Sequence, residues 1–76
     1  MSIIYAVVRT TDGHRSVVMV SRERGLADST ALDLAAGLHQ QFDVVPVTMP
    51  GFARFWGYRT MYERTCAEMR RTGFIS

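Results

Sequence analysis

The sequence contains no lysine, a single cysteine and no long apolar run, and each absence narrows the possible functions. The lone Cys66 excludes an internal disulfide framework and a cysteine-rich zinc site. No stretch approaches the roughly 20 apolar residues that cross a bilayer, and no apolar signal segment is present. We therefore expect a reduced, cytoplasmic protein that makes no membrane contact.

Motifs that would identify an enzyme or a cofactor site are also missing. Only two histidines occur, and neither His14 nor His39 has a metal-ligand spacing to Cys66 or to a pair of acids. The phosphate-binding patterns G-x-x-x-x-G-K-[ST] and G-x-G-x-x-G are absent. Cys66 is expected on the packed side of a helix, where a thiol behaves as a small apolar group. These features predict no catalysis, no cofactor and no metal.

Basic charge is carried by arginine alone. The formal net charge is +2, and residues 51–76 hold five arginines against two glutamates, whereas residues 1–50 hold four arginines against five acids. Arginine suits planar, bidentate and stacking contacts. The codons of a GC-rich genome would give the same composition without any such contact, so both explanations stay open.

The first 21 residues predict a β-hairpin. Two β-branched segments, "IIYAVVRT" and "RSVVMVS", flank Asp12 and Gly13, which suit a two-residue type I′ turn. With the turn centred there, the predicted pairs are Val8 with Val17, Val7 with Val18, Ala6 with Met19, and Tyr5 with Val20. One face then holds Ile4, Ala6, Val8, Val17 and Met19, and the other holds Ile3, Tyr5, Val7, Val18 and Val20. Both faces of the hairpin are apolar.

The middle of the chain predicts a helix and a third strand. The helix covers about 29–42, with Ser29 or Thr30 as its N-cap. Its inward stripe is expected to consist of Ala31, Leu34, Ala35, Leu38 and Phe42. The segment "DVVPVTM" predicts a strand at about 43–48. Pro46 cannot donate a ladder hydrogen bond, so this strand should lie at a sheet edge or carry a bulge.

The remaining residues predict a C-terminal helix over about 52–72. Helical spacing places a buried stripe along Phe55, Tyr58, Tyr62, Cys66 and Met69, with Met61 on the far side. Gly73 suits a left-handed residue after the helix, and Phe74 can then pack back on Met69 in a Schellman motif. Alternatively, Gly57 weakens the helix so that it begins only after that residue, which leaves "PGFARFWG" as a shaped loop.

These elements predict a single α+β domain, a small two-layer α/β sandwich of element order ββαβα. Its mainly antiparallel, three-stranded sheet has strand order 2-1-3 and carries two helices; order 1-2-3 is the alternative. If both helices cover one face, the other apolar face is exposed. A second copy, a different protein, or the last helix on the opposite face would then cover it, and a homodimer through this open sheet face is one expectation.

Candidate contact residues are those that the expected core does not use. Trp and Arg are enriched at binding hot spots because each combines a large contact area with a polar group. For Trp56, the alternative to partner contact is a structural role in covering the edge of the core. For Arg70 and Arg71, it is to balance the negative end of the helix dipole. The predicted partner-binding set comprises Arg22, Arg24, Arg54, Trp56, Arg59, Arg64, Arg70 and Arg71.

In size, ββαβα architecture and arginine-rich composition, the chain resembles the small single-domain inhibitors of bacteriophages and other mobile elements, the anti-CRISPR proteins among them. The resemblance rests on no diagnostic motif, so it transfers no functional residue. It implies a non-enzymatic protein that binds a host complex handling nucleic acid, in the host cytoplasm if a phage encodes it, and blocks guide, target or effector access. Many such inhibitors mimic DNA with an acidic surface, whereas the basic balance here favours docking on an acidic or mixed protein surface.

The sequence leaves two other functions open. One is direct nucleic-acid binding, in which arginines contact phosphates while Trp56 or Tyr58 stacks on a base. The low net charge and the lack of lysine make it less favoured. The other is a homodimeric accessory interaction module of a bacterium.

Overall fold

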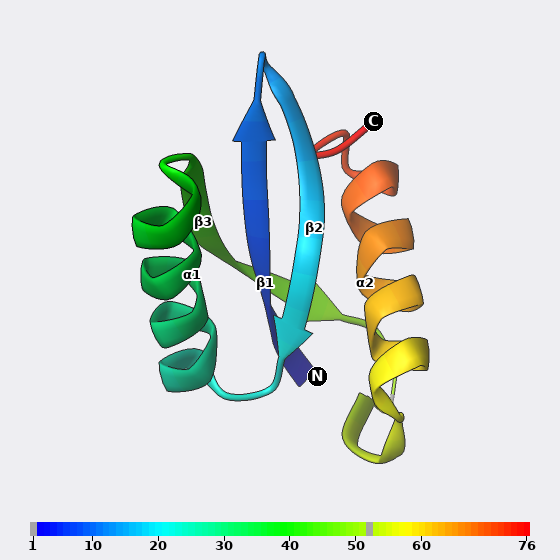
Figure 1. The fold of residues 1–76 in the computed structure, drawn as a ribbon. Helices are drawn as coiled ribbons and strands as arrows, with labels where there is room; N and C mark the ends of the chain where they lie inside the picture. The colour runs from blue at the N-terminus through cyan, green and yellow to red at the C-terminus, as the bar shows by residue number, and fades with distance from the viewer. Residues whose placement is uncertain (1, 52) are drawn as a thin grey trace.

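The computed structural model describes residues 2–51 and 53–76, and Figure 1 shows their arrangement. The described elements are β1 (Ser2–Thr11), β2 (His14–Ser21), α1 (Arg24–Leu38), β3 (Gln41–Met49), a 3-10 turn η1 (Ala53–Phe55) and α2 (Tyr58–Arg71). The predicted α+β class and the ββαβα order are confirmed. None of the described helices is long and apolar enough to span a membrane.

The sheet has the order β2-β1-β3, and β1 is antiparallel to both neighbours. The predicted order 2-1-3 is therefore confirmed, and the alternative 1-2-3 is wrong. Pro46 lies in the edge strand β3, opposite Tyr5, as its missing N–H predicts. Because β1 is central, its side chains are buried on both faces, which explains its nearly continuous apolar sequence.

The hairpin turn is confirmed, but part of its register is not. Asp12 and Gly13 have φ values of 50° and 79°, as a type I′ turn requires. Val8 pairs with Val17 as predicted, whereas a register shift between Val7 and Val8 makes Met19, rather than Val18, the partner of Val7. The extra residue is a β-bulge, which moves every later side chain of β2 to the other face.

This bulge exchanges the last two apolar side chains of β2. Val20 joins the core cluster under α2, and Met19 packs against the cluster under α1, which reverses the predicted faces. The predicted pairs of Ala6 with Met19 and of Tyr5 with Val20 are also wrong, because Ala6 pairs with Val20 and Tyr5 with Ser21.

The two helices lie on opposite faces of the sheet (Figure 1). On one face, Met61, Cys66 and Met69 of α2 pack in one cluster with residues of all three strands. On the other face, Ala27 and Ala31 of α1 pack against Val7. The fold thus has three layers, and the predicted two-layer arrangement is wrong. Because neither face is left without a helix, the expected homodimer through an open sheet face loses its physical basis.

Helix α1 lies earlier in the chain than the sequence predicts. It begins after Glu23, so Ser29 and Thr30 are interior residues rather than N-caps, and the Thr30 hydroxyl donates to the Leu26 carbonyl at 2.8 Å. The predicted start was wrong because the polar first turn faces solvent, while Ala27 makes the first buried contact with the sheet.

The predicted stripe of α1 is correct only in its first part. Ala31 is buried and Leu34 packs on the same cluster, but Leu38 is about half exposed. The helix ends at Leu38 because His39 adopts a left-handed conformation, with φ of 53°. Phe42 is therefore a residue of β3 and not of the helix.

Helix α2 begins after Gly57, as the alternative interpretation predicted, and its C-terminal end is the predicted Schellman motif. Gly73 has φ of 80°, the Phe74 N–H donates to the Met69 carbonyl at 2.9 Å, and the Gly73 N–H donates to the Arg70 carbonyl at 3.1 Å. The predicted uninterrupted helix from residue 52 is wrong, and Phe52 lies outside the described residues.

The buried face of α2 differs from the predicted stripe. Met61, predicted on the far side, is buried together with Thr65, whereas Phe55 and Tyr58, predicted buried, are 79% and 55% exposed. The prediction assumed that helical spacing continues from residue 52, but the chain turns at η1 and Gly57, so the earlier aromatic residues lose that alignment. Cys66 is buried and free, as predicted.

Candidate protein-binding surface

One end of the molecule gathers exposed apolar and arginine side chains. At this end β1 begins, β2 ends and both helices start, and the η1 turn lies just before α2 (Figure 1). We call this surface the loop end and define it by six residues: Ile3, Arg22, Leu26, Arg54, Phe55 and Tyr58.

The apolar part of the loop end is large for so small a domain. Ile3, Leu26, Phe55 and Tyr58 are each about half exposed or more. Among the described residues, the other large apolar side chains with comparable exposure are Leu32 and Leu38, further along α1. A chain of 76 residues has little apolar surface to spare, so a gathering of this kind indicates a contact surface.

Arg22 organises this end of the protein. Its Nη2 donates to the carbonyl oxygens of Ala53 at 2.8 Å and of Trp56 at 2.5 Å, which ties the end of β2 to the η1 segment. Arg22 was predicted as a partner contact. In the structure, Arg22 holds the η1 segment against the end of β2. The Arg22 side chain also lines two surface hollows.

Arg22 is the lining residue that these two hollows share. The described lining of the first, of about 300 Å³, is Ser2, Ile3, Ile4, Arg22, Ala53 and Arg54. The described lining of the second, of about 410 Å³, is Val20, Ser21, Arg22, Glu23, Leu26, Tyr58 and Met61. The first is therefore lined by two arginines and by no carboxylate of the described residues, whereas the second is mainly apolar and holds one arginine, Arg22, and one carboxylate, Glu23.

Two predicted arginines stack on neighbouring aromatic rings. The Arg54 Cζ lies 5.7 Å from the centroid of the Phe55 ring, and the Arg64 Cζ lies 4.9 Å from the Trp56 ring. Both are cation–π distances. Trp56 is partly buried and packs on the core below α2. It therefore covers the edge of the core, which is the structural role considered for it from the sequence.

Three other predicted arginines form ion pairs along the helices. Arg24 lies 3.7 Å from Asp28, and Arg59 lies 3.0 Å from Glu63. Such exposed i,i+4 pairs contribute only about 0.3–0.5 kcal/mol. Arg71 donates to Glu68 through its Nε at 3.0 Å. This hydrogen bond and the positive charge of Arg71 lower the pKa of Glu68, and the same contact raises the pKa of Arg71.

The predicted partner-binding residues therefore do not form one site. Arg22 and Arg54 meet at the first hollow, whereas Arg70 and Arg71 lie at the C-terminal end of α2, where Arg70 donates to the Ser76 carbonyl at 3.4 Å. The sequence also failed to identify the exposed apolar residues of the loop end. The break at Pro50, Gly51 and Gly57 was the signal that could have separated them from the helix.

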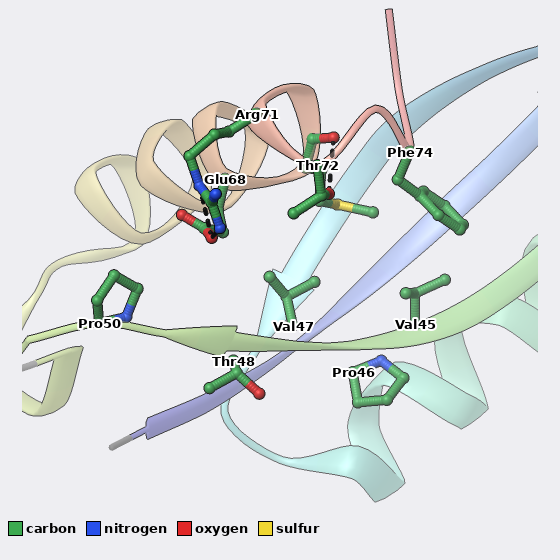
Figure 2. A pocket seen from close by; sticks show the side chains of 10 residues that line it. Val45, Pro46, Val47, Thr48, Pro50, Glu68, Arg71, Thr72 and Phe74 are labelled. Carbon is green, nitrogen blue, oxygen red and sulfur yellow. Dashed lines mark hydrogen bonds and ion pairs between the residues drawn. The ribbon is translucent and has the colours of Figure 1, made fainter.

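A third hollow, of about 510 Å³, lies between the open edge of β3 and the end of α2 (Figure 2). Val45 and Val47 point from β3 towards α2 there, while Pro46 and Thr48 point to the other side. Its two charged lining residues, Glu68 and Arg71, pair with each other. This groove is therefore an apolar hollow whose charges are already matched.

Tyr62 and Cys66 belong to the packed side of α2. The Tyr62 hydroxyl donates to the Val17 carbonyl at 2.6 Å, and burial, followed by the neighbouring Cys66, raises the pKa of Tyr62. Over residues 2–51 and 53–76, no group of three or more His, Cys, Asp or Glu side chains is placed to hold a metal ion.

Comparisons with known proteins found no matching family model, no matching curated protein and no matching solved structure. The function is therefore inferred from the chemistry of the loop end.

Proposed function

We propose that this protein is a non-enzymatic inhibitor that docks on another protein through the loop end. The observation that supports the proposal is the gathering of Ile3, Leu26, Phe55 and Tyr58, all exposed, around Arg22 and Arg54. Burying apolar surface contributes about 25 cal/mol per Å², so these side chains are a ready source of binding free energy. Tyr and Arg are also residue types on which interface energy concentrates.

The surrounding chemistry favours a protein partner over a nucleic acid. Ile3 and Leu26 are aliphatic and offer no ring for base stacking, and Arg24 and Arg59 already pair with carboxylates of their own helices. Non-specific nucleic-acid binding depends on many cations that neutralise phosphates, and the net charge here is only +2. The exposed rings of Phe55 and Tyr58 support nucleic-acid binding as the competing candidate.

For the partner, we propose a host complex that handles nucleic acid, with the docked protein blocking the complex's access to guide or target. The size, the element order and the basic balance of the chain support this class, through the resemblance to anti-CRISPR inhibitors. Docking of this kind requires no catalytic residue, because occupying a surface is sufficient to exclude nucleic acid.

The test is capture of CRISPR effector complexes from a bacterial lysate on the immobilised protein, followed by measurement of target-DNA binding by the captured complex. We expect the wild-type protein to capture a complex and inhibit its DNA binding. The double variant F55A/Y58A should keep its fold, since both side chains are exposed, and should lose capture and inhibition.

The matched control is Leu32→Ala, which truncates another exposed apolar side chain in the middle of α1 and should behave as wild type. Capture by F55A/Y58A at the wild-type level would overturn the assignment to the loop end. Direct binding of arbitrary DNA by the protein alone, with steep salt dependence, would favour the nucleic-acid alternative instead.

A further inference from the structure

The two hollows at the loop end differ in charge, and this difference indicates what the partner presents. We infer that the partner supplies an acidic side chain to the hollow between Arg22 and Arg54 and an adjacent apolar side chain to the hollow between Leu26 and Tyr58. This inference rests on the proposed function and adds the chemistry of the recognised segment.

The first hollow is complementary to a carboxylate. Arg22 and Arg54 line it, and no carboxylate of the described residues lies within ion-pair distance of either guanidinium group. The described hydrogen bonds of Arg22 use Nη2 alone, and Arg54 lies over the Phe55 ring. A guanidinium group has five N–H donors in a fixed plane, so both arginines retain donors for a bidentate contact with a carboxylate.

The second hollow is complementary to an apolar side chain. Val20, Leu26, Tyr58 and Met61 supply most of its lining. Among the described residues of that lining, the one carboxylate, Glu23, offsets the positive charge of Arg22, so this hollow favours an anion less than the first hollow does. The acidic and apolar groups of a partner are therefore directed to different hollows.

The two hollows share a lining residue, which suits neighbouring side chains of one partner segment. Arg22 lines both hollows, so a group bound in either one lies beside the same side chain. A short protein segment with an aspartate or glutamate beside an aliphatic or aromatic residue meets this requirement. A nucleic acid would present phosphates at both positions, and Glu23 disfavours that arrangement.

The experiment is selection of peptides from a random-sequence display library on the immobilised wild-type protein. We expect the enriched peptides to carry an acidic residue next to an apolar one. A synthetic peptide of the consensus sequence then serves as the probe in calorimetry. Arg54→Gln should weaken its binding by at least about tenfold, as expected when one partner of a desolvated charge pair is lost.

Arg70→Gln is the matched control, because it removes the same charge at the far end of α2 and should leave peptide affinity within about twofold of wild type. The inference is overturned if the enriched peptides lack acidic residues, if Arg54→Gln binds the peptide as wild type does, or if short mixed-sequence single-stranded DNA binds more tightly than the peptide. If Arg54→Gln captures the effector complex fully while F55A/Y58A does not, the proposed function stands and the carboxylate inference fails.

Discussion

The two ends of α2 use similar residue types in opposite ways. At the C-terminal end, the Schellman hydrogen bonds occupy the last carbonyl groups, Ile75 is buried, and Arg71 pairs with Glu68. At the N-terminal end, Gly57 provides no side-chain cap, and Phe55 and Tyr58 stay exposed beside Arg54. One end therefore packs its apolar and charged groups within the chain, whereas the other exposes the apolar and arginine side chains on which the proposed docking rests.

The two ends of α2 should differ most in how strongly the truncation of a side chain destabilises the protein. Met69→Ala, in the last turns of α2, should lower the free energy of unfolding by about 2–5 kcal/mol, because Met69 is 2% exposed and its truncation leaves a cavity. Tyr58→Ala, in the first turn, should cost less than about 1 kcal/mol. Urea denaturation monitored by circular dichroism measures both. Equal destabilisation by the two variants would remove the distinction between the ends.

The glycines that flank α2 should also respond differently. Gly73→Ala should cost about 1–2 kcal/mol, because Gly73 has φ of 80° and a Cβ atom is strained in that region. Gly57 has φ of −69° and ψ of 169°, and open space surrounds the position of an added Cβ, so Gly57→Ala should change stability by less than about 0.5 kcal/mol. Thermal unfolding of the two variants under identical conditions measures both changes in stability.

The contribution of Tyr62, on the packed side of α2, to stability should depend on pH. Its pKa is raised in the folded protein, so its contribution to stability is complete below about pH 10, the ordinary tyrosine pKa, and is lost as the pH rises through the higher folded value. Tyr62→Phe removes the 2.6 Å hydrogen bond to the Val17 carbonyl and should cost about 1 kcal/mol at neutral pH. The variant should also lose less stability than wild type between neutral pH and alkaline conditions. An identical alkaline decline in both proteins would contradict this role.

Charge reversal near the start of α2 should have little effect on stability. Arg54→Glu and Arg59→Glu should each change the free energy of unfolding by less than about 1 kcal/mol, because both side chains are exposed. Their effects on partner binding should differ, since Arg54 lines the first hollow and Arg59 pairs with Glu63. Titration of the captured partner with each variant should show strong weakening for Arg54→Glu alone. Equal weakening by both would indicate a general charge effect rather than a defined contact.

The features that local sequence determines were predictable from the sequence. Asp12 and Gly13 specified the turn, Pro46 indicated the edge strand, and Gly73 with Phe74 predicted the end of α2. Each of these depends on a backbone preference that acts over a few residues.

The features that depend on packing between distant elements were not predictable. The segment from Val17 to Val20 is apolar throughout, so no alternation in the sequence marks the bulge that exchanges Met19 and Val20. Both faces of the hairpin are apolar, which suits helices on one face or on two. The exposure of Phe55 and Tyr58 was missed because their spacing matches the buried stripe, although the η1 turn and Gly57 interrupt the helix before Tyr58.

Hydrogen–deuterium exchange of the protein, free and bound to its captured partner, tests most directly whether the loop end is the docking surface. If it is, residues 21–26 and 53–61, where the two hollows lie, should exchange more slowly on binding. Residues 45–50 and 68–74, which line the groove between β3 and α2, should exchange at unchanged rates. Protection confined to that groove, with residues 53–61 unaffected, would show that the loop end is not the docking surface.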